Sequence, residues 1–459
     1  MIKQRLYLAV LLSIIVSTES FSQTTEAFSL KQAWQAAFDS YPSLVEKQAN
    51  FQLAEAEKQQ VKQAFLPSLQ LQVQNSYGSS SGTSGAFFPL PGIFNVTGPV
   101  GPGTNAASSG NMFGSALADW KIFEFGRRRT ALKAADYAVK EAGSEINAAK
   151  LDLQIKVSRL YINMLYNQAK ADWAAQNAAR VKKILDLSAS LTSAGLKPGA
   201  DTLLASATYL QTQAELNEWE GKLLSSRIQF TEVVPAAPQN SRIVTTRFLN
   251  AYTDLLAGDS VGNSHPYLDG ISQRILQNQA QHELSARKIF PSISILGGTS
   301  FRASGISNEL VDNSWPASFN NGTKNYLVGI GLTWNISNIY TSGIEKKMAA
   351  QQVNASKSRY ELKLLQLRIG LQSSESRIST QIKQVNNTSK AVVNARSAYE
   401  LYLSRYENGL INLIELLQIE LLLQQSEKVN IEAYQQLWDQ VIIKSELSGN
   451  FSDLSNQFN

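Results

Sequence analysis

The sequence predicts an α/β membrane protein, in which strands from several chains form one transmembrane β-barrel and long helices continue its wall. Three observations predict this class: an internal duplication, segments that alternate apolar and polar residues, and proline-free helical stretches too long for a globular core. Together they describe a unit of two strands and two long helices that occurs twice.

The duplication shows in matched residues at fixed separations. Two pairs at the ends of the long helical stretches lie 214 positions apart: Trp120 with Trp334, and Gly195 with Gly409. Two pairs of prolines nearer the start of each repeat lie 224 positions apart: Pro42 with Pro266, and Pro67 with Pro291. The first hairpin loop is therefore expected to be 10 residues longer (224 − 214).

Four segments have the alternation that is typical of strands, at 68–77, 113–125, 292–301 and 326–336. In the first, Leu69, Leu71 and Val73 share one face, and glutamines occupy the other. An apolar face toward lipid and a polar face toward a lumen are typical of a transmembrane barrel strand. A half-buried strand of a soluble sheet has the same pattern. The stretch between the first two strands, 78–112, is rich in Gly, Ser and Pro and is expected to lack regular structure.

The helical stretches need partners along their whole length. Arg127 to Ala194 contains no proline and would span roughly 100 Å at about 1.5 Å per residue. Apolar residues in it keep near-heptad spacing: Leu151, Ile155, Ile162, Leu165 and Ala169. The second long stretch carries a strict heptad: Ile378, Val385, Val392, Tyr399 and Tyr406. Both patterns predict coiled-coil packing.

Composition places the chain outside the cytoplasm and limits its partners. Residues 1–22 combine a basic start, an apolar core and a small-residue site, as a secretory signal peptide does. The whole chain carries a formal charge of +5, and removing the leader leaves about +4, too little to indicate nucleic-acid binding. Without cysteine, neither disulfides nor a lipidated N-terminal thiol is possible.

Membrane physics then requires an oligomer. An open four-stranded sheet cannot sit in lipid, because its edges leave backbone groups without hydrogen-bond partners. Strands from several chains must close one barrel, and the helices that start where the strands end must continue its wall. Physical reasoning from the residues thus predicts a membrane-anchored helical tube.

The chain resembles the TolC family of outer membrane channel-tunnels over nearly all of its mature length. The resemblance rests on the proline positions, the strand-to-helix junction Phe123–Arg127, the duplication and two Gly-Leu turns. It implies a homotrimer with a twelve-stranded barrel in outer membrane lipid and a periplasmic tunnel of twelve helices. It also implies an exit duct for drug efflux or type I secretion, in which a periplasmic adaptor protein links the duct to a proton-driven or ATP-driven inner-membrane pump. No cofactor is expected.

The predicted segments follow this plan. They are a signal peptide at 1–22; periplasmic helices at 23–67 and 264–291; β-hairpins with an extracellular loop at 68–125 and 292–336; a long helix, tip turn and return helix at 126–232 and 337–448; an equatorial connector at 233–263; and a polar, disordered tail at 449–459.

The resemblance places the two turns at the periplasmic tip, where the adaptor docks. Gly195 and Gly409 are expected to adopt positive φ, which only glycine does cheaply. Leu196 and Leu410 follow them and are expected to be exposed until a partner covers them. The alternative is that these leucines pack between neighbouring helices.

The tube entrance is expected to be gated near the same turns. Asp201 and Glu415 lie six residues after their glycines, and a ring of such carboxylates selects cations and binds divalent ions. Tyr406 and Asp201 match the family's tyrosine and aspartate at the constriction. Ile411 stands where the family commonly has a closing arginine, and Lys197 is a candidate substitute. The alternative for Asp201 and Glu415 is a solvated outer helix face.

Two other classes of function remain open at this point. An exported coiled-coil adhesin or structural surface protein would share the heptads and the signal peptide, but it needs no alternating strands. An enzyme is disfavoured, because His265 and His282 are the only histidines and there is no cysteine to complete a metal site. We expect His265 to cap a helix and His282 to lie on a helix face.

Overall fold

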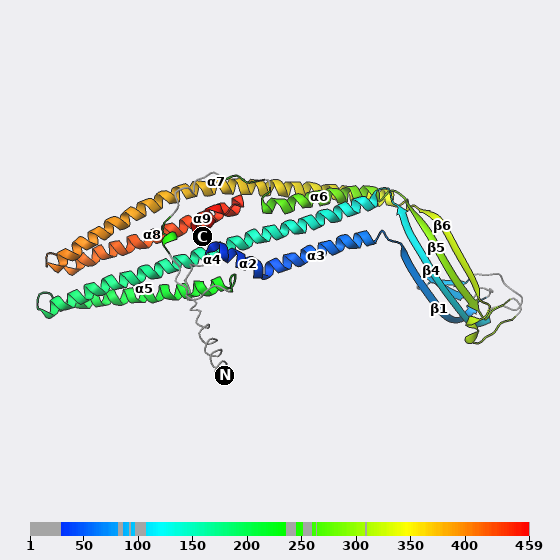
Figure 1. The fold of residues 1–459 in the computed structure, drawn as a ribbon, viewed down its shortest axis with the longest axis horizontal. Coiled ribbons are helices and arrows are strands. Elements are labelled where there is room, and N and C mark those ends of the chain that lie inside the picture. The colour runs from blue at the N-terminus through cyan, green and yellow to red at the C-terminus, as the bar shows by residue number, and fades with distance from the viewer. Residues whose placement is uncertain are drawn as a thin grey trace, which may run out of the picture. The chain divides into compact units, whose positions relative to one another are not determined.

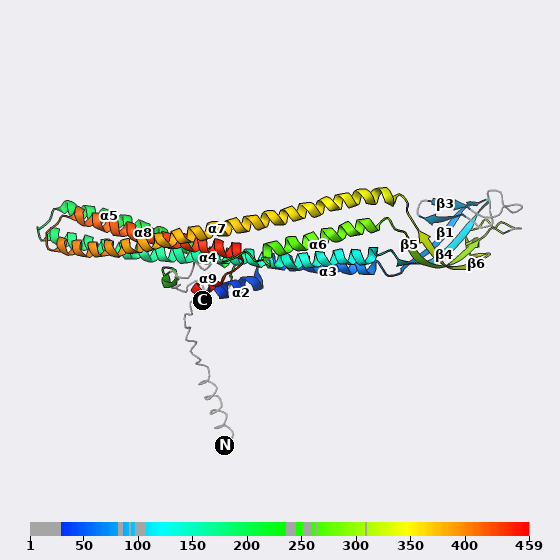
Figure 2. The ribbon, with the colours of Figure 1, turned by 90° about the horizontal axis from the view of Figure 1, so that it is seen from above.

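A computed structural model describes residues 29–80, 86–90, 93–96, 107–235, 245–250, 259–262, 264–307 and 310–458. The predicted signal peptide and much of the predicted connector lie outside the described residues. Figures 1 and 2 show two repeats of strands followed by long helices. Across the described residues, no helix has both the length and the apolar character needed to span a bilayer.

The chain forms two compact units, each built from separate segments. The first comprises residues 1–45, 148–265 and 364–459, and the second comprises 46–147 and 266–363. Two long helices, α4 (Arg127–Ser193) and α7 (Asn338–Glu407), contribute residues to both units. Their lengths of 67 and 70 residues confirm the prediction of two exceptionally long helices.

The second unit contains an antiparallel four-stranded sheet with the order β1-β4-β5-β6. Its strands are β1 (Ser68–Ser80), β4 (Ala107–Phe123), β5 (Ser292–Ser304) and β6 (Thr323–Thr333). The register aligns Leu71, Ala116, Thr299 and Tyr326 across the sheet, so the apolar residues predicted to face lipid share one face. The edges of the sheet are β1 and β6.

The expectation that 78–112 lacks regular structure is wrong. β1 continues to Ser80 and β4 begins at Ala107, while β2 (Ala86–Leu90) pairs with β3 (Ile93–Val96). The expectation rested on the average composition of the segment. That average does not reveal short runs of aromatic and β-branched residues, which favour extended backbone. Glycine and serine in the flanking segments are held in strands by the ladder with the partner strand. In the second hairpin loop, η2 (Pro316–Phe319) forms a short 3-10 turn.

Shorter helices pack against the first halves of α4 and α7 in this unit. They are α3 (Pro42–Gln63), which begins in the first unit, and α6 (Pro266–Arg287), and each has its proline at the first helical position. Ion pairs join α3 to α4: Lys47 lies 3.1 Å from Glu145, and Lys58 lies 2.7 Å from Asp136.

The repeat extends to individual hydrogen bonds at the strand-to-helix junctions. The indole nitrogen of Trp120 donates to the backbone oxygen of Phe65 at 3.1 Å. The indole nitrogen of Trp334 donates to the backbone oxygen of Ile289 at 3.0 Å. Each acceptor lies two residues before a proline that precedes a strand, so the duplication inferred from spacing is confirmed in the structure.

The first unit consists of two antiparallel helical hairpins and their supports. α4 pairs with α5 (Gly199–Thr231), and α7 pairs with α8 (Leu413–Ser448), as both views show. Most of the predicted heptad residues are buried, with Leu165 at 1% and Ile378 at 0% exposure, while Val392 is half-buried. Ser29 and Gln32 form a capping box at the start of α2 (Leu30–Ser40). The connector contributes the turn η1 (Thr245–Arg247).

The predicted disordered tail is instead a packed helix, α9 (Ser452–Phe458). Leu454 and Phe458 are buried, and the ring of Phe458 meets Trp438 edge to face at 4.9 Å between centroids. Buried Lys444 joins the tail to α8 through Asp453, at 3.0 Å. The composition of these seven residues is polar on average, but the two apolar side chains, Leu454 and Phe458, are spaced to fall on one helix face.

Candidate functional site at the helical turns

Each long hairpin reverses at a glycine with left-handed backbone, as predicted. Gly195 has a φ of 75° and Gly409 a φ of 73°. In both turns, the amide of the next residue donates to the carbonyl five residues earlier, at 2.9 Å. This is the 6→1 bond of a Schellman motif, which satisfies carbonyls at the end of a helix. The two turns therefore share one geometry, which a side chain at the glycine would strain.

The residue after each glycine is an exposed leucine. Leu196 is 69% exposed and Leu410 is 73% exposed. Within the described part of the chain, no atom lies within 4 Å of the place where a side chain on either glycine would begin. Within one chain, these leucines thus do not pack between helices, and each turn presents an exposed apolar side chain.

Lys197 links the two turns. Its ammonium group donates to the backbone oxygen of Ile411 at 3.3 Å and lies 5.5 Å from the centroid of the Tyr406 ring. Lys197 is half-buried, so both contacts are partly shielded from water. Lys197, which follows the first turn, therefore contacts the second turn through the backbone of Ile411.

Tyr406 is fully buried in an apolar cluster at the turn end of the hairpins. The cluster includes Ile184, Ala205, Leu413 and Leu416. Burial raises the pKa of the Tyr406 hydroxyl; the nearby Ser188 hydroxyl opposes this shift, and the charge of Asp201 adds to it. The hydroxyl has no hydrogen-bond partner with good geometry among the described residues. Lys197, Tyr406 and Asp201 thus share one neighbourhood.

Asp201 and Glu415 occupy matching places in the repeat but different surroundings. Asp201 is half-buried in the first turn of α5. Glu415 is exposed, and it exchanges two hydrogen bonds with the N-cap residue Asn412, at 2.9 and 2.8 Å. The side chain of Asn412 thereby caps α8 by accepting from the backbone N–H of Glu415. The Glu415 carboxylate accepts from the Asn412 side-chain amide, so it helps to hold that cap in place.

An ion-pair network that sequence reasoning missed lies further along the same hairpins. Arg180 on α4 contacts Glu427 on α8 at 2.8 Å and approaches Glu420 at 3.7 Å. Arg396 on α7 contacts Glu427 at 2.8 Å. Both glutamates are buried. The network therefore connects the two hairpins of one chain.

The sequence contains a signal that could have found this network. Leu413, Leu416 and Leu423 mark the buried face of α8 at heptad spacing, and Glu420 and Glu427 continue the same positions. A carboxylate at a core position of a coiled coil must be paired or neutral, because an isolated buried charge is costly. Those two residues therefore predict cationic partners, although not which ones.

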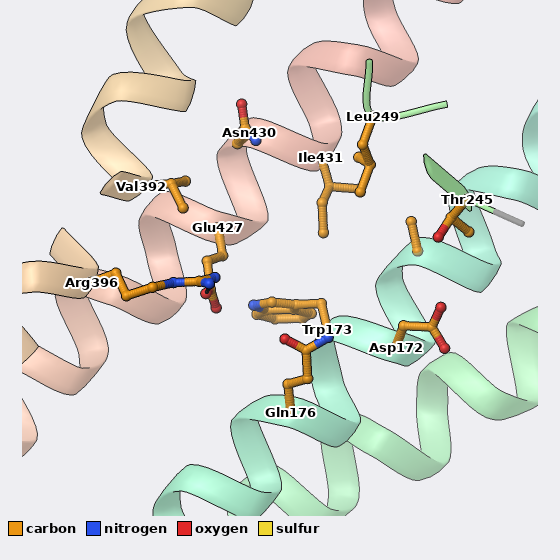
Figure 3. Close-up of a pocket in the computed structure, with 11 residues that line it drawn as sticks. Asp172, Trp173, Gln176, Thr245, Leu249, Val392, Arg396, Glu427, Asn430 and Ile431 are labelled. Carbon is orange, nitrogen blue, oxygen red and sulfur yellow. Dashed lines mark hydrogen bonds and ion pairs between the residues drawn. The ribbon is translucent and has the colours of Figure 1, made fainter. Parts of the chain in front are cut away.

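A cavity of about 340 Å³ opens beside the Arg396–Glu427 pair (Figure 3). Trp173 and Ile431 contribute apolar surface, and Figure 3 shows the indole nitrogen of Trp173 turned toward Arg396 and Glu427. Trp173 is 4% exposed, and its nitrogen has no hydrogen-bond partner among the described residues.

Within the described ranges, no group of three or more His, Cys, Asp or Glu side chains could hold a metal ion. His265 is buried and its Nε2 lies 3.1 Å from the backbone oxygen of Glu446. His282 lies half-buried on α6. Both positions agree with structural roles.

Comparison with known protein families shows which family the chain belongs to. The sequence profile described as "Outer membrane efflux protein" matches residues 33–234 and 260–442. The chain belongs to the outer membrane efflux protein family. The predicted family and outer membrane localisation are confirmed, and the family and fold are those of channel proteins.

Solved structures with the same fold cover nearly the whole efflux protein. The outer-membrane channel OprN is 17% identical, with a TM-score of 0.71, over 92% of this chain and 90% of that chain. The outer membrane protein VceC from Vibrio cholerae is 16% identical, with a TM-score of 0.70, over 92% and 97%. These likenesses confirm the predicted fold class of strands continued by long helices.

Among curated proteins, the fusaric acid resistance protein FusA of Burkholderia cepacia is 24% identical over 139 residues. The match covers 30% of this efflux protein and 26% of FusA. It therefore spans only about a quarter of that relative's length.

Proposed function

We propose that this efflux protein is, as a homotrimer, the outer membrane exit duct of a tripartite system. Its strands form the barrel and its hairpin loops face the exterior. Its long helices form a periplasmic tunnel, whose turns dock an adaptor protein that links the duct to an inner-membrane pump.

The open sheet supports assembly from several chains. β1 and β6 are the sheet edges, and side chains on one face of each are strongly exposed, with Val73 at 73% and Ile330 at 77%. Edge backbone groups and apolar side chains in lipid need closure into a barrel. Three chains of four strands give twelve strands, and joining β1 of one copy to β6 of the next removes every edge.

The observation that carries the docking proposal is the pair of identical turns, each with an exposed leucine. Two apolar groups held by the same rigid Schellman geometry form a repeated binding element at one end of the hairpins. Exposed apolar groups of this kind mark interaction sites. Gly195, Leu196, Gly409 and Leu410 are the residues that we assign to adaptor docking.

The entrance gate combines the groups near these turns. Lys197 holds the second turn through the Ile411 backbone and the Tyr406 ring, and it replaces the family's arginine from the opposite turn. Asp201 and Glu415 supply carboxylates, six in a trimer, that favour cations near the narrow end. We assign opening and closing to the relative movement of the two hairpins.

We infer no enzymatic activity for the chain, since its family and fold are those of channels. For cargo, we place small organic molecules ahead of proteins, because a relative matched over 139 residues is named for resistance to fusaric acid. Growth of a deletion strain on fusaric acid, with and without the restored gene, tests whether the cargo is a small organic molecule.

The proposal is tested by Gly409→Pro in a strain that exports a fluorescent dye through this system. Proline cannot adopt the φ of 73° at this position, so the turn must change while the buried helices keep their packing. A folded outer membrane trimer with export lost is the expected result. Unimpaired export by the folded variant would exclude docking at this turn.

A further inference from the structure

Glu420 is a buried carboxylate that the proposed gate does not use. It is 2% exposed and lies on α8, where it faces Arg180 on α4. The distance of 3.7 Å between Arg180 Nε and Glu420 Oε1 is too long for a hydrogen bond, and both atoms lack other hydrogen-bond partners within the described structure. Arg180 is instead engaged by Glu427, at 2.8 Å.

The groups around Glu420 come from all four helices of the two hairpins. Arg180 belongs to α4, Glu215 to α5 and Tyr399 to α7, and Glu427 lies one heptad along α8. Burial raises the pKa of Glu420 to about 7; Arg180 opposes this shift, and the negative charges of Glu427 and Glu215 add to it. Two further cations serve the other carboxylates, since Arg396 lies 2.8 Å from Glu427 and Lys428 lies 3.6 Å from Glu215. Glu420 is the most buried of the three carboxylates, and its cationic neighbour Arg180 is held by Glu427.

Glu420 also adjoins the gate. Leu416 and Leu423, one turn to either side of it on α8, belong to the apolar cluster that contains Tyr399 and Tyr406. Any movement of α7 and α8 away from α4 and α5 opens this cluster and admits water to Glu420. The packing of the two hairpins and the ionisation of this carboxylate are therefore coupled.

We propose that Glu420 is a proton-responsive gating residue: protonated, it lets the two hairpins pack closely near the turns, and ionised, it favours their separation. This inference rests on the proposed movement of the hairpins at the entrance. It adds a determinant of opening that lies outside the turns and depends on a proton rather than on a partner.

The direction of the pH effect follows from linkage. Closed hairpins bind the proton of Glu420 more tightly than open ones. In open hairpins the carboxylate is hydrated, and its pKa returns toward the ordinary value of 4.5. The closed form is therefore most stable below that value and loses stability as pH rises to about 7. One pKa unit corresponds to a factor of ten, so the ratio of open to closed hairpins rises about tenfold per protomer from pH 6 to pH 8.

Planar-bilayer recording of the purified trimer tests this, with three proteins compared at pH 6 and pH 8. In the parent, the ratio of open to closed time is expected to rise at least about tenfold, the factor for one protomer. Glu420→Gln removes the titrating group and keeps its shape, so its open probability should not change between the two values. Glu432→Gln is the matched control, because Glu432 also lies on α8 and pairs with Lys170 on α4, at 2.9 Å. It should retain the parent's response.

A second measurement does not depend on conduction. The chain has no cysteine, so spin labels at Leu196→Cys and Leu410→Cys report the separation of the turns. The distance distribution should shift toward longer values at pH 8 in the parent and in Glu432→Gln, but not in Glu420→Gln. Equal distributions at both pH values in the parent, or a shift that survives Glu420→Gln, overturns the inference. Neither result affects the proposed duct, which is tested separately by whether the trimer forms a channel at all.

Discussion

The ammonium group of Lys197 donates a hydrogen bond to the backbone oxygen of Ile411 at 3.3 Å, and this contact ties the two turns of one chain together. Lys197 follows the first turn glycine by two residues, and Ile411 follows the second by two, so the linked residues are equivalents in the repeat. The two equivalents differ in their groups: the first hairpin supplies the side-chain donor of Lys197, and the second supplies the backbone acceptor of Ile411.

The first prediction concerns this link. Lys197→Met keeps the apolar stem and removes the donor, and a hydrogen bond of this kind contributes about 1 kcal/mol. Open probability in planar bilayers should therefore rise about fivefold. Lys182→Met is the control, because Lys182 pairs with Asp186 on its own helix, at 2.7 Å. An unchanged open probability in Lys197→Met would show that the Lys197–Ile411 contact does not help to close the entrance.

The second prediction concerns ion selectivity. The double change Asp201→Ala and Glu415→Ala should weaken cation preference and reduce block by divalent ions, because six carboxylates leave the entrance of the trimer. Asn412→Ala is the control: it breaks the cap that Glu415 shares but leaves every carboxylate in place. Selectivity and block equal to those of the parent would assign both carboxylates to a solvated face.

The third prediction concerns docking. Leu196→Glu combined with Leu410→Glu places charges on two side chains that are already exposed, so folding and assembly should be unaffected. Export should fall by at least tenfold, because an adaptor would have to bury the new carboxylates. Leu310→Glu, at a residue of 76% exposure in the second hairpin loop, should export normally. Normal export by the double variant contradicts docking at the turns.

Which of these features the sequence could predict depends on whether the cause is local. Period-two alternation around Leu71 and the heptads through Ile378 depend on a residue's neighbours in the chain, and both predict the observed elements. The partner of Glu420 lies 240 positions away (420 − 180), on another hairpin, and no periodicity connects them. The Lys197–Ile411 contact likewise arises from tertiary packing, although the position of Lys197 two residues after Gly195 makes it a candidate for the gate.

The C-terminal tail differs, because its own residues carry a helical pattern that the polar residues between them obscure. Phe451, Leu454 and Phe458 occupy one face at helical spacing, yet the two serines, Asp, Asn and Gln between them lower the mean hydropathy of the segment. The buried partners Trp438 and Tyr161 decide the outcome, because they supply an apolar surface for a helix of only seven residues.

The fourth prediction follows from that tail. Phe458→Ala removes a ring that is 2% exposed, and such truncations typically cost about 3–5 kcal/mol. Amide hydrogen exchange should accelerate throughout α9 in the folded trimer. The exposed neighbour change Asn456→Ala should leave exchange unaltered. Equal protection in both variants would mean that the tail is held by other contacts.

The fifth prediction concerns assembly. Cysteines at Val73 on β1 and Val328 on β6 are introduced into a chain that has none, and both positions are strongly exposed. A short bismaleimide linker should produce covalent dimers and trimers, because closure brings these edges together between copies. Either single variant should remain monomeric on denaturing gels. A double variant that crosslinks only within one chain would contradict closure between protomers.

The most direct test of the exit-duct account is the current carried by the purified protein in a planar bilayer. The account predicts discrete channel openings from a particle whose native mass is three times that of one mature chain. A particle of another stoichiometry, or a folded trimer that leaves the bilayer without conductance at every pH and voltage, would contradict it.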